Sequence, residues 1–192
     1  MTYFDNNATS PLYPIARESL VSALDEAWQN PSSPYRSAAR VYGLLELARE
    51  KFAAALCCKA EEIVFNSGAT EGSDAVFAWI KGISDDDACV LVSRTEHPCV
   101  IESAKAFFGE RVVWLDVDEN GLISCEQLEE CLQERKICLV AIMAANNETG
   151  ILAPINEVGT LCRSVGVKWL CDATQWIGKL SASDLSVADI LI

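Results

Sequence analysis

Short, mostly apolar runs alternate with amphipathic helical patterns from residue 88 to residue 192. The apolar runs cover residues 88–92, 112–117, 137–145, 167–171 and 188–192. Between them the apolar residues recur at helical spacing, and Ser124 with Gln127 has the signature of a helix capping box. Strands that are apolar over most of their length, without alternation of apolar and polar residues, are typical of a mostly parallel sheet covered on both faces. The sequence therefore predicts an α/β fold with three layers, a mostly parallel sheet with helices on both faces.

The residues before this region predict two helices and one more strand. A helical pattern runs from Pro11 to Trp28 and stops at the turn of residues 30–34. A second, stronger pattern runs from about Ser37 to Leu56, and the run 63–65 is typical of a strand. We therefore expect an N-terminal segment, residues 1–36, and a large domain, residues 37–192.

Composition narrows the possible partners and the compartment. The formal charge of −13 argues against nucleic acid or an anionic membrane as partner, because both need a basic surface. The first residues lack a secretory signal, and the longest apolar run is too short to span a bilayer. Nine cysteines without a C-x-x-C spacing favour buried thiols over disulfides or a metal site. We expect a cytoplasmic protein.

Polar groups follow the predicted strands at the ends where ligands bind. They lie at residues 67–70, 96–97, 146–147 and 172–175. In open parallel sheets, ligands bind beyond the carboxyl ends of the strands. The first group belongs to the stretch IVFNSGATE, residues 63–71, where a Ser-Gly turn leads into a helix. Backbone N–H groups at such a helix start bind anions, so a phosphate is expected there.

Asp172 is a carboxylate placed directly after an apolar strand, where an unpaired charge is costly. One interpretation is an N-cap of a following helix. The other is a partner for a cationic ring nitrogen, as pyridoxal phosphate requires. The residues alone leave both interpretations open.

His97, Asn147 and Gln175 are weaker candidates in the same predicted cleft. His97 is the only histidine, and it could stack on a planar cofactor and move protons, or simply cap a helix. Asn147 and Gln175 offer amides for a carboxylate and a ring hydroxyl, or they could be ordinary turn residues.

Six motifs occur here in the order found in cysteine desulfurases. They are DNNATS, NPSS, EEIVFNSGATEGSD, TEHPCV, MAANNETG and CDATQWIGKL, between residues 5 and 180. The chain resembles this family, part of the class V group of fold-type I pyridoxal-phosphate enzymes, over essentially its whole length. The resemblance implies the large domain of a pyridoxal-phosphate-dependent transferase, cut off before the lysine loop that holds the cofactor.

The resemblance assigns cofactor roles position by position. Ala69 and Thr70 match the turn that binds the cofactor phosphate. His97 matches the catalytic histidine that stacks on the pyridine ring and assists proton transfer. Asp172 matches the aspartate paired with the ring nitrogen, and Gln175 matches the glutamine beside the phenolic oxygen.

The family's reaction is the removal of sulfur from L-cysteine, which gives alanine and an enzyme persulfide. Asn147 matches an asparagine near the substrate carboxylate and the cofactor. The resemblance also implies a homodimer in the complete enzyme and a sulfur acceptor protein serving iron–sulfur cluster assembly or thiolation. No metal is expected.

The sequence departs from the family at the cofactor lysine and the persulfide cysteine. No lysine or cysteine of the 192 residues lies at a matching position, so we expect this chain alone to be inactive. A second polypeptide could supply the missing half. Two alternatives remain: an inactive binding or regulatory module that keeps the cofactor cleft, and part of another class V enzyme such as a selenocysteine lyase or aminotransferase.

Overall fold

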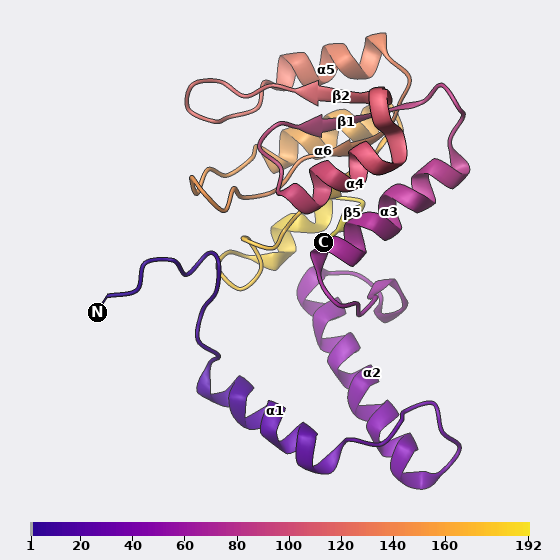
Figure 1. Cartoon of the computed structure of the whole chain (residues 1–192), viewed down its shortest axis with the longest axis vertical. Helices are drawn as coiled ribbons and strands as arrows, with labels where there is room; N and C mark the ends of the chain where they lie inside the picture. Colours follow the sequence, from indigo (N-terminus) through magenta and orange to yellow (C-terminus); the bar gives the residue numbers. More distant parts are fainter. Residues whose placement is uncertain (1) are drawn as a thin grey trace. The chain divides into compact units, whose positions relative to one another are not determined.

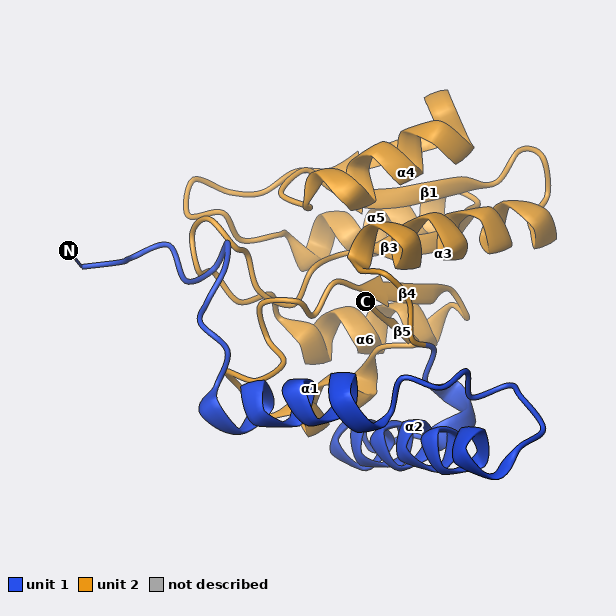
Figure 2. Cartoon of the chain, turned by 60° about the horizontal axis from the view of Figure 1, so that its bottom comes forward, with its two compact units in different colours: residues 1–64 blue, residues 65–192 orange. Residues whose placement is uncertain are grey.

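The computed structural model describes residues 2–192, which divide into two compact units between Val64 and Phe65 (Figure 2). The sequence favoured a division after residue 36, at the turn that ends the first helix. The structure instead keeps the second helix and the segment after it in the first unit, where Arg49 donates a hydrogen bond to the carbonyl of Ile63. The domain organisation of the whole protein stays a prediction.

The first unit contains α1, Pro14–Glu26, α2, Arg36–Leu56, and the short 3-10 helix η1, Ala60–Glu62. Both predicted helices form, but α1 buries no residue and α2 buries only Ala38 and Ala53. Apolar side chains remain exposed along both helices, for example Ile15 of α1 at 75% and Leu44 of α2 at 48%. Within residues 2–64 the two amphipathic faces therefore lack the apolar cover that their patterns require.

The predicted strand at residues 63–65 is wrong. These residues join no sheet, and Val64 is 78% exposed. An apolar β-rich run becomes a strand only where a neighbouring strand takes up its backbone hydrogen bonds, and the described residues provide none here.

The second unit is built around a five-stranded parallel sheet with the order β2-β1-β3-β4-β5. The strands are β1, Cys89–Ser93, β2, Val112–Leu115, β3, Ile137–Ala141, β4, Lys168–Cys171, and β5, Ile190–Leu191. Each of the five predicted apolar runs from residue 88 onward coincides with a strand. β1 is shifted by one residue from its run, and the other four strands are shorter than their runs. The run 137–145 stays buried to its end, but regular pairing stops at Ala141.

Helices cover both faces of this sheet, as the sequence predicts (Figure 1). On one face lie α3, Ala69–Ile83, and α4, Pro98–Phe108, with Phe77 and Val100 in the core. On the other lie α5, Cys125–Glu134, and α6, Ile155–Ser164, which bury Leu128 and Val158 around Trp169 of the sheet. The 3-10 helices η2, Gly109–Arg111, and η3, Ala182–Val187, complete the unit. The predicted three-layer α/β fold is confirmed.

The burial of the cysteines agrees only partly with the sequence expectation. All nine cysteines are free, and three are buried: Cys99, Cys162 and Cys171. Cys57 is exposed and ends α2 in a left-handed conformation, with φ of 57°. Among residues 2–192, no helix is both long enough and apolar enough to cross a membrane.

Candidate functional site

The N-terminus of α3 presents backbone N–H groups without acceptors. Gly68 precedes the helix with φ of 149°, a conformation almost restricted to glycine. Within residues 2–192, the N–H groups of Ala69 and Thr70 donate to no oxygen. The Glu71 carboxylate turns back to Ser67, whose backbone N–H and hydroxyl donate to it at 2.7 and 2.6 Å. The free N–H groups and the helix dipole make this turn suitable for an anion.

Asp172 directly follows β4 and is 6% exposed. Its Oδ1 accepts the backbone N–H of Thr174 at 2.9 Å, and a turn follows in place of the helix that an N-cap would need. No lysine, arginine or histidine in residues 2–192 forms an ion pair with this carboxylate. A buried carboxylate without a protein cation suits a positively charged ligand atom.

His97 is the N-cap of α4, so the capping interpretation is correct. Its Nδ1 accepts the backbone N–H of Cys99 at 3.2 Å, and Nδ1 lies 3.0 Å from the Cys99 Sγ. The imidazole remains exposed. Capping therefore uses one ring nitrogen and leaves the ring accessible for a second role.

Hydrogen bonds connect the elements that carry these residues. Ser73, in α3 one turn after Ala69, places its hydroxyl 3.9 Å from the Cys99 Sγ at the start of α4. The backbone N–H of Ala144 donates to the carbonyl of Asp172 at 2.9 Å. Three features therefore lie on connected elements at the carboxyl ends of the parallel strands, as the sequence predicts: the turn at the N-terminus of α3, His97 and Asp172.

Glu96 is the residue of this region to which the sequence assigned no role. It is 5% exposed, and its Oε1 accepts the backbone N–H of Met143 at 2.6 Å. Burial, and less strongly the charge of Asp172, raise the pKa of Glu96 to about 8, although the bond to Met143 opposes the rise. The available signal was its position in the short loop after an apolar strand, similar to the position of Asp172 directly after β4.

Asn147 and Gln175 lie in the predicted loops, and each has a hydrogen bond to a residue close to it in sequence. Asn147 Nδ2 donates to Glu148 at 3.1 Å, and Lys179 Nζ donates to Gln175 Oε1 at 2.5 Å. The described contacts do not join either amide to Asp172 or His97. Their assignment to a ligand stays a prediction.

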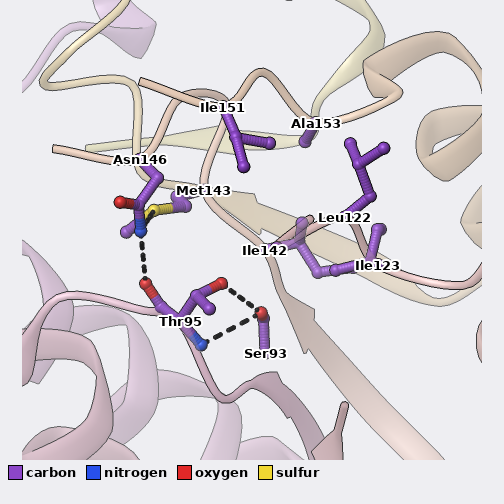
Figure 3. A pocket seen from close by; sticks show the side chains of 10 residues that line it. Ser93, Thr95, Leu122, Ile123, Ile142, Met143, Asn146, Ile151 and Ala153 are labelled. Carbon is purple, nitrogen blue, oxygen red and sulfur yellow. Dashed lines mark hydrogen bonds between the residues drawn. The ribbon is translucent and has the colours of Figure 1, made fainter. Parts of the chain in front are cut away.

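A small cavity lies between the ends of β1 and β3 and the loops after them (Figure 3). Its volume is about 20 Å³, and its lining includes Ser93, Thr95 and Ile151. Asn146 points across it and donates to the carbonyl of Thr95 at 3.1 Å. The cavity has room for about one water molecule, so it is no cofactor site.

The donor set suits a phosphorylated, nitrogen-containing ring better than a metal. Free N–H groups at α3 match a phosphate, and the unpaired carboxylate of Asp172 matches a protonated ring nitrogen. Residues 2–192 contain no group of three or more His, Cys, Asp or Glu side chains that could hold a metal ion.

The sequence of this chain is similar to a known protein family and to known proteins. The family described as Aminotransferase class-V matches residues 2–190. The mitochondrial cysteine desulfurase of Saccharomyces cerevisiae is 35% identical over 189 residues, which are 93% of this chain and 36% of that protein.

Solved structures agree in fold. A structure described as SspA in complex with cysteine has a TM-score of 0.90 and 28% identity, over 100% of this chain and 56% of that one. A NifS-like protein has a TM-score of 0.89 and 30% identity, over 98% of this chain and 52% of that one. The chain therefore spans about half of these structures, and less of the yeast protein.

Proposed function

The chain belongs to the aminotransferase class-V family, and on that premise we propose that it is the cofactor-binding part of a cysteine desulfurase. Such an enzyme uses pyridoxal 5'-phosphate to remove sulfur from L-cysteine. The observation that carries the proposal is the buried carboxylate of Asp172, which lacks a protein cation in residues 2–192 and lies beyond the end of β4. The named relatives and the cysteine complex of SspA support the choice of reaction and substrate.

The residues of this chain would hold the cofactor through four kinds of contact. The N–H groups of Ala69 and Thr70 bind the phosphate, and Asp172 holds a proton on the ring nitrogen by its negative charge. His97 offers its exposed imidazole for stacking and for moving a proton at Nε2. When bound, pyridoxal phosphate supplies an electron-withdrawing ring for the chemistry at the substrate. Asn147 and Gln175 are proposed to contact the substrate carboxylate and the phenolic oxygen.

An inactive cofactor-binding module is the second candidate for these 192 residues. Burial raises the pKa of the Cys99 and Cys171 thiols, which opposes formation of the thiolate that sulfur transfer needs. Lys179, the lysine that follows the Asp172 loop, bonds to Gln175. We therefore expect binding without turnover from this chain alone, and a second polypeptide as the source of a lysine and a reactive thiol.

Several finer assignments stay predictions. They include the homodimer, the sulfur acceptor protein and a role in iron–sulfur cluster assembly or thiolation. A cytoplasmic location is also only a prediction, and the yeast relative carries the word mitochondrial in its name.

The test is a titration of the purified chain with pyridoxal phosphate, followed by the absorbance and induced circular dichroism of the cofactor. We expect saturable binding of one cofactor per chain, and no sulfide release when L-cysteine is added together with a thiol reductant, which is needed to convert a persulfide to sulfide. Absence of binding would overturn the cofactor assignment. Sulfide release would overturn the prediction of inactivity. Pyridoxal without the phosphate is the matched ligand control for the turn at Ala69 and Thr70.

A further inference from the structure

Glu96 has one oxygen bonded and the other without a partner. Its Oε1 accepts the N–H of Met143 at 2.6 Å, whereas Oε2 is fully buried and has no hydrogen-bond partner in residues 2–192. A buried polar oxygen left unpaired costs free energy, and an ionised carboxylate in that place costs more.

The groups that face Glu96 disfavour its charge. Asp172 adds a negative charge beside it, and Cys99 and Cys171 are neutral thiols within its electrostatic reach. His97 is its neighbour in sequence, and no lysine or arginine in residues 2–192 forms an ion pair with it. Burial and Asp172 together raise the pKa of Glu96 to about 8, so the side chain is neutral at pH 7.

The bond from Met143 connects two parts of the cofactor cleft. Glu96 immediately precedes His97, and Met143 immediately precedes Ala144, whose N–H donates to the carbonyl of Asp172 at 2.9 Å. Glu96 and Asp172 are therefore held by consecutive residues of the segment that follows β3. Through this segment the loop that carries His97 is tied to the strand end that carries Asp172.

We propose that Glu96 is a positioning residue: as a neutral carboxyl bonded to Met143, it holds the His97 loop at a set distance from Asp172. The proposal rests on the proposed cofactor function, because His97 and Asp172 are the two groups that it positions. A charged Glu96 would place a second buried anion beside Asp172 and weaken the same arrangement.

The neutral state makes folding stability depend on pH. Between pH values near 4.5 and 8, the unfolded chain loses the Glu96 proton while the folded chain keeps it. The stabilising contribution of the Glu96 proton is therefore complete below the pKa of Glu96 in the unfolded chain, and it is lost as pH rises toward 8.

The first experiment measures the melting temperature of the cofactor-free chain from about pH 5 to about pH 8. Glu96→Gln keeps a neutral acceptor for Met143 and cannot ionise. Its melting temperature should rise relative to that of the unaltered chain by several degrees across this range. Glu102→Gln, at an exposed position of α4, is the matched control and should follow the unaltered chain. If the melting temperatures of Glu96→Gln and the unaltered chain change in parallel with pH, the inference that Glu96 is a neutral carboxyl is overturned.

The second experiment tests the positioning role by titration with pyridoxal phosphate. Glu96→Gln should bind within about twofold of the unaltered chain, and Glu96→Ala about tenfold more weakly, the size expected for one lost buried hydrogen bond. Amide exchange at Met143 should accelerate in Glu96→Ala and stay slow in Glu96→Gln. Equal cofactor affinity in all three proteins would overturn the positioning role. If the unaltered chain binds no cofactor, the proposed function and the positioning role fail, while the melting curves still decide whether Glu96 is neutral.

Discussion

The Nδ1 atom of His97 accepts the backbone N–H of Cys99 at 3.2 Å and lies 3.0 Å from the Sγ of the same cysteine. Because Nδ1 is the acceptor, the proton of the neutral imidazole lies on Nε2. One histidine thus caps α4 and keeps a donor for a ligand. These two roles can be separated by substitution.

Replacing His97 separates the cap from the ring. His97→Ala should lower the free energy of unfolding by about 1 kcal/mol, because the cap is lost. His97→Asn should recover most of that loss, since asparagine is a good N-cap, but not the cofactor affinity that ring stacking provides. Urea denaturation and a pyridoxal phosphate titration check the two effects. Full cofactor affinity in His97→Asn would contradict a role for the ring.

Gly68 can be tested against a glycine without backbone strain. Gly68→Ala should destabilise the chain by roughly 1–3 kcal/mol, because φ of 149° is unfavourable for alanine, and it should weaken cofactor binding. No atom lies within 4 Å of the added Cβ, so strain and not a clash is the cause. Gly82→Ala in α3, also without a close neighbour, should stabilise by about 0.5–1 kcal/mol. Denaturation curves compare the pair, and equal stabilities would refute the strain argument.

Asp172→Asn tests the ring-nitrogen assignment. The asparagine Oδ1 can still accept the N–H of Thr174, so the fold should persist while cofactor affinity falls by about tenfold or more. The substitution also removes the charge that helps to raise the pKa of Glu96, so stability should fall less steeply with pH. The exposed Asp86→Asn serves as the control. Unchanged cofactor affinity in Asp172→Asn would overturn the assignment.

The exposed apolar faces of α1 and α2 predict self-association of the chain in solution. Contiguous exposed apolar surface promotes contact between molecules. Ile15→Glu together with Leu24→Glu should reduce the sedimenting mass at micromolar concentration without loss of the melting transition, because α1 buries no side chain. Ser19→Glu, on the same helix, is the control for added charge. A monomeric, cooperatively melting unaltered chain would contradict this prediction.

The sequence predicted the fold well where its signals are local. The apolar runs after residue 88 identified all five strands, and helical spacing identified the helices between them. The strand at residues 63–65 was predicted by the same signal and is wrong, because strand formation also needs a neighbour that the local pattern does not contain. Asp172 and His97 were found from their positions after strands, and their ligand roles stay predictions.

The sequence did not reveal that Glu96 is buried. By itself the sequence determined most of the strands and helices, and it indicated that polar residues follow the carboxyl ends of the strands. Both results depend on hydrophobic periodicity and on the succession of elements along the chain, which are local properties of the sequence. The tertiary structure decided which of those residues are buried, what they bond to and which are charged. Glu96, Met143 and Asp172 are far apart in sequence and meet only after the strands pair. A pKa depends on that meeting, because desolvation and nearby charge exist only in the folded chain.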